Sequence, residues 1–279
     1  GDVPQSVHAG FEVAVPCRRL STMARETMMS IDTAAMLEAR DVHVTFGGIS
    51  ALSGVNLTIA PGQVFGLIGP NGAGKTTMVN VLSGFQQPTR GTVRLAGRPV
   101  AESGPSRAAR AGIARSFQAG RLFKDLTVLE NLMVAALGSG LRSRPARLRA
   151  LEVLDWIGCG DLAAQRCDSL SYGHERRIGI GRALALGPLF ALLDEPASGM
   201  NDAECEDLMH LISGIPGRFG CGVLLIEHNM QVIMGACHRI HVLDGGRSLA
   251  EGSPQEIQAD PEVRRAYLGH KSDNPALHI

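Results

Sequence analysis

The alternation of hydrophobic and polar positions along this chain predicts a fold that mixes strands and helices. Leu37 to Val44 and Ala51 to Ile59 contain period-2 stretches typical of half-buried strands, and the turn residues Gly47-Gly48 separate them. Val64 to Ile68 is a continuous apolar run, as expected for a parallel strand buried on both faces of its sheet. This part of the chain therefore indicates a pair of outer strands followed by a central one.

The rest of the pattern alternates between helices and buried strands, which favours an α/β fold. A helix from Thr76 to Leu82 and a strand pair around Gly91 to Leu95 come before a helix-rich segment from about Leu126 to Leu184. The arginine-containing run Leu141–Arg149 within that segment is most simply a solvated helix face or loop. Helical material inserted between the strands of one α/β core indicates two lobes within a single domain. The later predicted strands are Phe190 to Leu193, Val223 to Ile226 and Ile240 to Leu243.

The pattern also predicts how the chain is divided. Residues 1–35 have no clear apolar period, so we expect a disordered extension; a docking tail is the functional alternative. They also lack the basic start, apolar run and small-residue site of a signal peptide. The folded domain is predicted to span residues 36–270, with a helical subdomain at about 120–182, and residues 271–279 form a tail.

Composition narrows the classes of function. Lys plus Arg and Asp plus Glu both total 27, so the chain has no electrostatic footprint for bulk binding of nucleic acid or of a membrane surface. The six cysteines are scattered without a CxxC pair, which is typical of reduced thiols. No uncharged apolar run approaches the ~18 residues that a membrane span needs. If a membrane is involved in the function, another chain must provide it.

The segment Gly69-Pro-Asn-Gly-Ala-Gly-Lys-Thr76 matches the pattern G-x-x-x-x-G-K-[ST] of a phosphate-binding loop, with a strand before it and a helix after it. Its glycines let successive backbone N–H groups point at phosphate oxygens, with the helix dipole behind them. Lys75 supplies a positive charge to the outer phosphates, and the Thr76 hydroxyl is placed to coordinate Mg²⁺. The sequence therefore predicts a nucleoside triphosphate site formed by Asn71, Gly72, Ala73, Gly74, Lys75, Thr76 and Thr77.

Two carboxylates complete the predicted catalytic centre. Asp194 and Glu195 follow four apolar residues, so they lie at the carboxyl end of a buried strand, where α/β sheets bind their ligands. Asp194 suits Mg²⁺, directly or through a water molecule. Glu195 is placed as the base for an attacking water.

Three further features separate the classes of protein that carry a phosphate-binding loop. Gln118 can reach a metal ion and a water from its place between that loop and the helical middle, although an ordinary surface glutamine has the same pattern. His228 ends a third apolar strand, where it can hydrogen-bond a γ-phosphate; a capping or core histidine is the alternative. Ser171 and Gly173, at the mouth of a helix, form a second anion site.

The second anion site predicts a second copy of the chain. One triphosphate already has its cradle in residues 69–77, so the site at Ser171 and Gly173 should face a different nucleotide. The simplest geometry is a head-to-tail dimer in which each Ser171-Tyr172-Gly173 covers the ATP of the partner. The Asn/Thr-Lys-x-Asp element of guanine specificity is absent from the sequence.

The chain carries an ordered set of motifs: GPNGAGKTT, RSFQ, LSYGHERR, LFALLDEP and LLIEHNM. By this set, the chain resembles the ATPase subunit of ABC transporters over residues from about 40 to 270. The resemblance implies a P-loop ABC-ATPase fold, with a parallel-sheet RecA-like core, an antiparallel β subdomain and an inserted helical subdomain. It also implies that Phe46 stacks on adenine, that Gln118 contacts Mg²⁺ and water, and that His228 is the switch histidine. Leu170 to Gly173 match the family's signature motif.

Some positions depart from the commonest form of the family. Ser198-Gly-Met-Asn201 matches the loop that links the two sites of the dimer, but its usual terminal Asp is Asn201. His174 replaces the usual Gln or Glu of the signature motif, and Tyr172 is the other departure there.

Within the family, several details of the chain resemble the importers of branched-chain amino acids. These are FGGISAL, RLFKDLTVLENLMVA, Tyr172, EHNM and DPEVRRAYLG. Lipopolysaccharide-export ATPases are the nearest rival, since they share RSFQ, an ERR-containing signature and a similar ending. Urea or amide importers of the same branch stay open.

The resemblance implies an ATPase that works at two composite sites with ATP and Mg²⁺. Its expected partners are transmembrane permease subunits, a second ABC ATPase subunit, identical or paralogous, and a periplasmic or extracellular substrate-binding protein, with no nucleic acid. The expected location is the cytoplasmic face of the cell membrane, as a peripheral protein. Two other classes are alternatives: a non-transport ABC ATPase of DNA repair or translation, and a regulatory nucleotide binder. The first would show a coiled-coil insertion or zinc-type cysteine pairs, and the second would lack Glu195 or His228.

Overall fold

The strands of the protein form two sheets in the computed structural model, which describes residues 36–100, 104–116 and 122–268. These residues belong to one compact unit of the chain. The predicted extension at residues 1–35, the tail at 271–279 and Gln118 lie outside the described residues. The division into domains and subdomains therefore stays a prediction.

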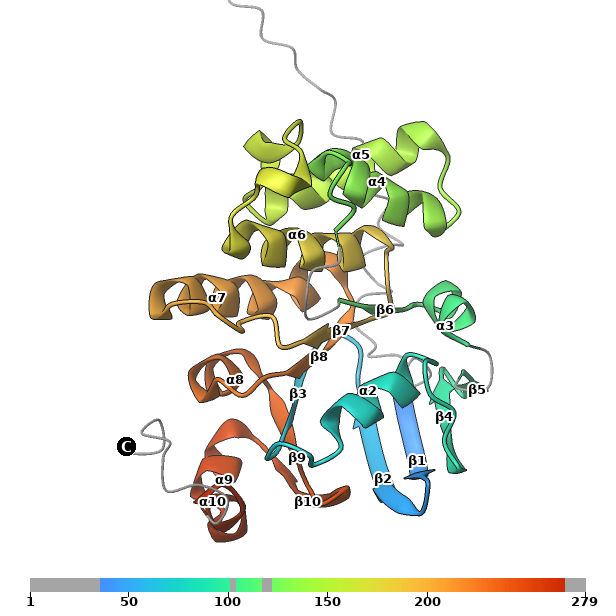
Figure 1. Ribbon diagram of the computed structural model, residues 1–279, viewed down its shortest axis with the longest axis vertical. Coiled ribbons are helices and arrows are strands. Elements are labelled where there is room, and N and C mark those ends of the chain that lie inside the picture. Colours follow the sequence, from blue (N-terminus) through green and yellow to red (C-terminus); the bar gives the residue numbers. More distant parts are fainter. Residues whose placement is uncertain (1–35, 101–103, 117–121, 269–279) are drawn as a thin grey trace, which may run out of the picture. The chain divides into compact units, whose positions relative to one another are not determined.

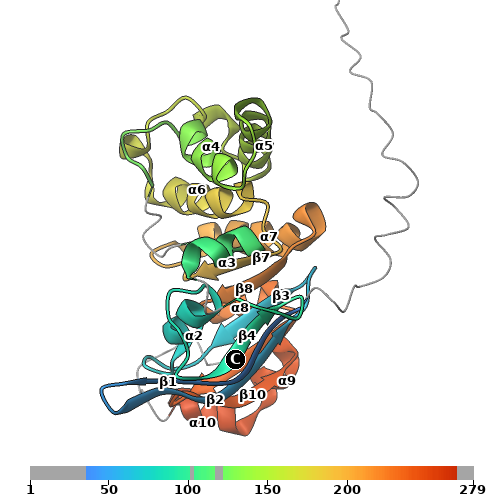
Figure 2. The same cartoon turned by 90° about the vertical axis from the view of Figure 1, so that its right-hand side faces the viewer.

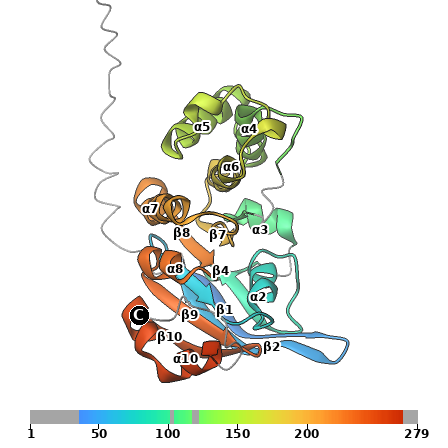
Figure 3. The same cartoon turned by 60° about the vertical axis from the view of Figure 1, so that its left-hand side comes forward.

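The first sheet is antiparallel, with the strand order β2-β1-β4-β5. Figure 2 shows β1 with its neighbours β2 and β4. The register of β1 and β2 runs from Leu37 opposite Ile59 to Phe46 opposite Ile49, so the predicted turn Gly47-Gly48 closes a hairpin. Figure 3 shows α2 beside this sheet. Its strands are β1 Leu37–Phe46, β2 Ile49–Ile59, β4 Arg90–Leu95 and β5 Arg98–Pro99.

The second sheet has the order β10-β9-β3-β8-β7-β6, in which only the pair β10-β9 is antiparallel. Parallel pairing brings the carboxyl ends of β3, β7 and β8 to the same edge of the sheet, and these are the ends that carry the predicted motifs. Its strands are β3 Val64–Ile68, β6 Ile113–Arg115, β7 Phe190–Asp194, β8 Gly222–Ile226, β9 Arg239–Asp244 and β10 Arg247–Gly252.

Both faces of the second sheet are covered, which explains the continuous apolar runs in its strands. Side chains of a strand alternate between its two faces. In β8, Val223 and Leu225 join a core built with the helices α4 to α8, whereas Leu224 and Ile226 join a core shared with the antiparallel sheet and α2. The central strands therefore need apolar residues at every position.

Helices connect these strands, and most of the inserted ones follow β6. In Figure 1, α6 lies between α4 and α5 on one side and α7 on the other, and these helices pack together. A Cβ at Gly181 of α6 would lie 2.8 Å from the Ile157 side chain, so the glycine permits this close packing. The helices are α2 Lys75–Leu82, α3 Pro105–Ala111, α4 Val128–Gly138, α5 Ser143–Trp156, α6 Tyr172–Ala185, α7 Asp202–Phe219, α8 Met230–Ala236, α9 Pro254–Ala259 and α10 Pro261–Leu268, with short 3₁₀ turns at Gly160–Leu162 and Cys167–Ser169.

The predicted strands and the helix after the phosphate loop are confirmed to within two residues at most ends. Strands β6 and β10 were not predicted, because β6 has only three residues and β10 is largely polar. The basic run lies in α5, where Arg144 and Arg147 are exposed, as expected of a solvated face. The described cysteines are free thiols and are buried. None of the described helices is long and apolar enough to cross a membrane.

Candidate functional site

The phosphate-binding loop leads from β3 into α2, and its backbone requires glycine at two places. Gly69 has φ +150°, and a Cβ there would lie 2.1 Å from the carbonyl oxygen of Leu243 on β9. Gly74 has φ +99° and precedes α2, where a Cβ would lie 2.7 Å from the Ala51 carbonyl oxygen. Any side chain at these positions would displace the loop from its neighbouring strands. The loop is therefore held between β9 and β2.

Lys75 begins α2 and folds back over the loop. Its Nζ donates hydrogen bonds to the carbonyl oxygens of Gly69 at 2.6 Å and Pro70 at 3.0 Å. Burial lowers the pKa of Lys75, and the charges of Glu195 and Asp194 act in the opposite direction. The ammonium group therefore lies in the field of both carboxylates, close to where phosphate oxygens would need a cation.

The two carboxylates lie at the carboxyl end of β7. Asp194 is buried and accepts a hydrogen bond from Arg115 Nη2 at 2.8 Å, and Arg115 Nη1 donates to Asn80 Oδ1 at 2.6 Å. Glu195 has φ +47°, in a region that non-glycine residues rarely adopt. Its backbone N–H donates to the Ile226 carbonyl oxygen at 2.9 Å, which fixes the turn after the strand. Strained backbone of this kind is concentrated at functional sites.

The donors at this site suit a magnesium ion. Thr76 and Asp194 offer a hydroxyl and a single carboxylate, which are hard oxygen ligands. No group of three or more His, Cys, Asp or Glu in the described part of the chain is arranged to hold a metal ion. A few protein oxygens with the remaining ligands supplied by phosphate and water are the usual arrangement for Mg²⁺, rather than an all-protein cage.

The predicted switch residue, His228, follows a buried carboxylate, Glu227, that has no role predicted from the sequence. His228 follows β8 and its side chain is 65% exposed, so it is accessible to a ligand. The side chain of Glu227 is fully buried and accepts hydrogen bonds from the backbone N–H of Ala197 at 2.5 Å and of His228 at 3.2 Å. Burial raises the pKa of Glu227, and these N–H donors partly offset the effect. Glu227 thus joins the loops that follow β7 and β8.

The signature motif lies at the start of α6, as predicted. Ser171 caps the helix: its Oγ accepts from the His174 N–H at 3.4 Å and lies 2.9 Å from His174 Nδ1. Among the described residues, no hydrogen bond or ion pair joins Ser171 to residues 69–77 of its own chain. That separation agrees with an anion site that serves another molecule.

The signature motif packs against the loop before α7. The Tyr172 ring covers Gly199, where a Cβ would lie 3.0 Å from the ring, and the Arg176 guanidinium lies 4.7 Å from the ring centroid. Arg176 also donates to the Tyr172 hydroxyl. Asn201 caps α7 by accepting the Glu204 N–H at 3.0 Å. An amide oxygen serves this purpose as well as a carboxylate, so Asn in place of Asp keeps the cap.

Phe46 lies in the hairpin that β1 forms with β2. It is the last residue of β1, beside the exposed turn Gly47-Gly48, and 49% of it is exposed. The ring is therefore accessible for stacking. The strand after this turn, β2, contacts the phosphate loop at Gly74.

Sequence reasoning missed three residues that hold the site together. Arg115 was part of the quoted RSFQ motif, and Glu227 follows a buried strand just as Glu195 does, so both carried a usable signal. Tyr267 of α10 lies in the segment DPEVRRAYLG, but nothing in the sequence indicated a contact with the phosphate loop: it hydrogen-bonds the backbone of Gly69, and burial raises its pKa. The C-terminal helix therefore contacts the phosphate loop.

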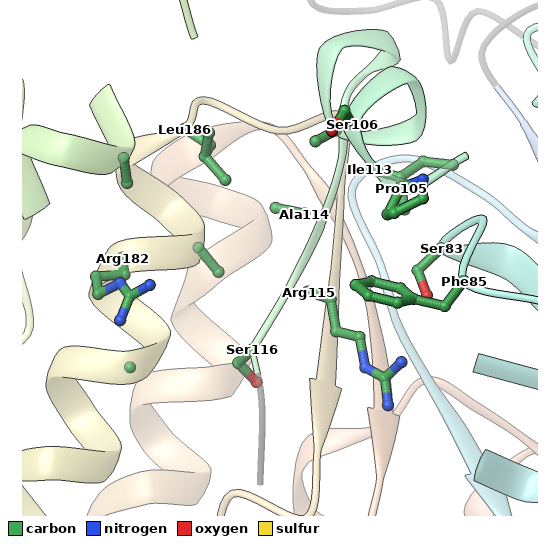
Figure 4. A pocket seen from close by; sticks show the side chains of 14 residues that line it. Ser83, Phe85, Pro105, Ser106, Ile113, Ala114, Arg115, Ser116, Arg182 and Leu186 are labelled. Atoms are coloured by element: carbon green, nitrogen blue, oxygen red, sulfur yellow. The ribbon is translucent and has the colours of Figure 1, made fainter. Parts of the chain in front are cut away.

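A cavity of about 370 Å³ lies beside the site, between the end of α2, α3 and β6 on one side and α4 and α6 on the other (Figure 4). Arg115 and Phe85 line one wall, and the Arg115 guanidinium lies 5.7 Å from the Phe85 ring centroid. Arg182 of α6 lines the opposite wall, and burial lowers its pKa. The cavity therefore borders the inserted helices and β6, the strand that pairs with β7.

Comparison with known proteins gives a consistent result. Residues 52–198 match the family described as ABC transporter, and residues 247–273 match the family described as branched-chain amino acid ATP-binding cassette transporter. The chain is 41% identical over 249 residues to the high-affinity branched-chain amino acid transport ATP-binding protein LivG of Escherichia coli K12, covering 84% of this chain and 98% of that one. It is 34% identical over 234 residues, 84% of this chain and 97% of that one, to the lipopolysaccharide export ATP-binding protein LptB of Acidithiobacillus ferridurans.

Solved structures agree with the fold. The ADP conformation of MJ1267, an ATP-binding cassette of an ABC transporter, superposes with a TM-score of 0.76 at 27% identity, covering 84% of this chain and 99% of that one. The ATP-binding cassette MJ0796, in a dimeric post-hydrolysis state bound to ADP and phosphate, gives 0.70 at 28% identity over 78% of this chain and 98% of that one. The predicted α/β architecture is confirmed.

Proposed function

The chain belongs to the ABC transporter family, and from this we propose that it is the ATP-hydrolysing subunit of a transporter that imports branched-chain amino acids. The observation that carries the proposal is the match to LivG over nearly its whole length, with Lys75, Asp194, Glu195 and His228 of the predicted set present in the described structure. The match of residues 247–273 to the branched-chain amino acid family supports the same substrate class. The lipopolysaccharide-export alternative has less support, because that relative is the less similar.

In the proposed reaction, ATP is hydrolysed at two composite sites of a head-to-tail dimer. Lys75 and the loop amides hold the phosphates, and Glu195 polarises the attacking water. His228 is placed to hydrogen-bond the γ-phosphate, and Gln118 belongs to the proposed site by its sequence position. Ser171 and Gly173 of the second copy stabilise the charge that develops on the γ-phosphoryl group. The dimeric state of MJ0796 supports this arrangement.

Mg²⁺ is part of the proposal, with Thr76 and Asp194 as the residues that would hold it and Gln118 as the further contact. When bound, the ion neutralises charge on the β- and γ-phosphates. Phe46 is the proposed contact for adenine, since its ring is accessible and stacking requires only an aromatic face.

The proposed partners are transmembrane permease subunits, a second ATPase subunit and a substrate-binding protein outside the membrane. Because none of the described helices can cross a membrane, the permeases must provide the path for the amino acid. We place the chain at the cytoplasmic face of the cell membrane, where ATP is available. Closure of the dimer around ATP and its reopening would drive the permeases between their two states.

Uptake by cells that lack the gene tests the proposal. Deletion should abolish high-affinity uptake of radiolabelled leucine, and the wild-type gene should restore it. Glu195→Gln should fail to restore uptake, because the amide cannot polarise the water. Glu206→Gln, a matched change at an exposed carboxylate on α7, should restore it. Normal leucine uptake in the deletion strain, with lipopolysaccharide lost from the cell surface, would instead favour the export function.

A further inference from the structure

Arg115 connects three parts of the molecule that the proposed reaction uses separately. It ends β6, and its guanidinium donates to Asp194 on β7 at 2.8 Å and to Asn80 on α2 at 2.6 Å. Asn80 in turn accepts the backbone N–H of Phe85 at 2.8 Å through its carbonyl oxygen. Arg115 also lines the cavity beside Phe85 (Figure 4). One side chain therefore links the carboxyl end of β7, the helix of the phosphate loop and the cavity.

The ion pair between Arg115 and Asp194 is buried, with the two side chains 9% and 10% exposed. Solvent and salt screen such a pair much less than a surface pair. A buried carboxylate without a cation is strongly destabilising, so Arg115 stabilises the fold when no metal ion is present. The same positive charge repels a divalent cation that approaches Asp194.

We propose that Arg115 is a positioning residue that holds the Asp194 carboxylate until Mg²⁺ arrives and exchanges with the metal ion there. The inference rests on the proposed role of Asp194 toward Mg²⁺. Mg²⁺ binding weakens the ion pair, and the guanidinium turns toward the cavity of about 370 Å³, which gives it room to move. Binding of Mg²⁺ at Asp194 thereby moves the positive charge of Arg115 toward the boundary between the sheet and the inserted helices.

The proposal is tested by measuring the affinity for a fluorescent ADP analogue with excess Mg²⁺ and with EDTA. The ratio of the two affinities is the magnesium coupling. In Arg115→Met this ratio should rise by about tenfold, because the ion no longer competes with a cation. The melting temperature without nucleotide should fall, since Asp194 loses its partner, and Mg²⁺ with ADP should recover more of it than in the wild type.

Two further variants keep the outcome interpretable. Arg115→Lys preserves the positive charge but not the second donation to Asn80, so its coupling should stay near the wild-type value. Arg239→Met removes an arginine from a pair of 3.0 Å with Glu251 on β10, at the opposite edge of the same sheet, and should leave the coupling unchanged. If Arg115→Met does not fold, Arg115→Lys still tests the proposal. A magnesium coupling that rises about tenfold in Arg115→Lys, which keeps the positive charge, would contradict the proposed role of that charge.

Failure of this inference can be told apart from failure of the proposed metal site. If Asp194→Asn leaves the magnesium coupling unchanged, Asp194 does not hold the ion and the proposed site is wrong. If Asp194→Asn lowers the coupling but Arg115→Met fails to raise it, the site stands and the exchange is overturned. When Arg115→Met is added to Asp194→Asn, it should have no further effect on the magnesium coupling.

Discussion

At the scale of single residues, the site depends on polar side chains that are buried and fully engaged. Glu227 is the clearest case, because it has no solvent exposure and yet accepts N–H donors from two different loops. Its burial favours the protonated form, while the donors favour the charged form. Burial is the larger effect, so its pKa in the folded protein lies above the ordinary value of 4.5.

The pH dependence of stability tests this assignment. A carboxyl group with a raised pKa in the folded state contributes stability that is complete below pH 4.5 and is lost as the pH rises through the folded pKa. Glu227→Gln removes this loss, so its free energy of unfolding relative to the wild type should increase as the pH rises above 4.5. Urea unfolding at a series of pH values measures the difference.

Glu256 gives a control of opposite sign. Hydrogen bonds from the Ser253 backbone and hydroxyl lower its pKa, so its contribution is present above pH 4.5 and is lost as the pH falls through its folded pKa. Glu256→Gln should therefore lose stability relative to the wild type at neutral pH, and the difference should vanish in acid. A Glu227→Gln curve parallel to that of Glu256→Gln would contradict the burial argument.

At the scale of elements, α6 and the loop before α7 are joined through one aromatic side chain. Tyr172 covers Gly199 and lies under the buried Arg176, whose Nε has no hydrogen-bond partner in the described structure. Arg176 therefore depends on the Tyr172 ring and hydroxyl for its favourable interactions. Tyr172 thus has a structural role, the packing of Arg176 and Gly199, that its place in the signature motif did not reveal.

Substitutions at Tyr172 should separate the ring from the hydroxyl. Tyr172→Phe keeps the stacking and should cost about 1 kcal/mol in the free energy of unfolding, the worth of one hydrogen bond. Tyr172→Ala also removes the stacked ring and should cost roughly 2–3 kcal/mol. In the alanine variant the kcat for ATP should fall, while the ATP affinity of the monomer should stay unchanged, since Tyr172 belongs to the surface proposed to serve the partner. Equal effects of the two substitutions would rule out the role of the ring.

At the scale of the whole molecule, the proposal gives each chain two half-sites that do not serve each other. Lys75, Asp194 and Glu195 are assigned to one half, and Ser171 with Gly173 is assigned to the other. No hydrogen bond or ion pair between described residues joins Ser171 to the phosphate loop. A head-to-tail dimer is the closed arrangement in which both halves are used.

Mixing two inactive variants tests this arrangement. Ser171→Arg should abolish hydrolysis without weakening ATP binding to the monomer. Glu195→Gln should also abolish hydrolysis, because it removes the base from the other half of the composite site. In an equal mixture half the dimers are mixed, and each contains one intact site, so roughly a quarter of the wild-type rate should return. The double variant mixed with Glu195→Gln provides the control, because it forms no intact site and should stay inactive. Loss of ATP binding in the Ser171→Arg monomer would contradict the assignment to the partner.

The sequence alone predicted the phosphate loop, the carboxylates after β7, and roles for His228 as a switch histidine and for Ser171 in the signature motif. Each of these depends on residues that are contiguous in the chain, so the strand, turn and helix around them can be recognised from local pattern alone. The strands of the central sheet were predictable for the same reason, because burial on both faces requires an unbroken apolar run.

The connections between these parts become visible only in the folded protein. Arg115 and Asp194 are 79 residues apart, and Glu227 is 30 residues from Ala197. Such pairs have no period or spacing in the sequence, because parallel pairing of strands through long connections brings them together. The ion pair at Asp194, the shared carboxylate between two loops and the packing of Tyr172 on Gly199 therefore follow from the fold and not from any one motif.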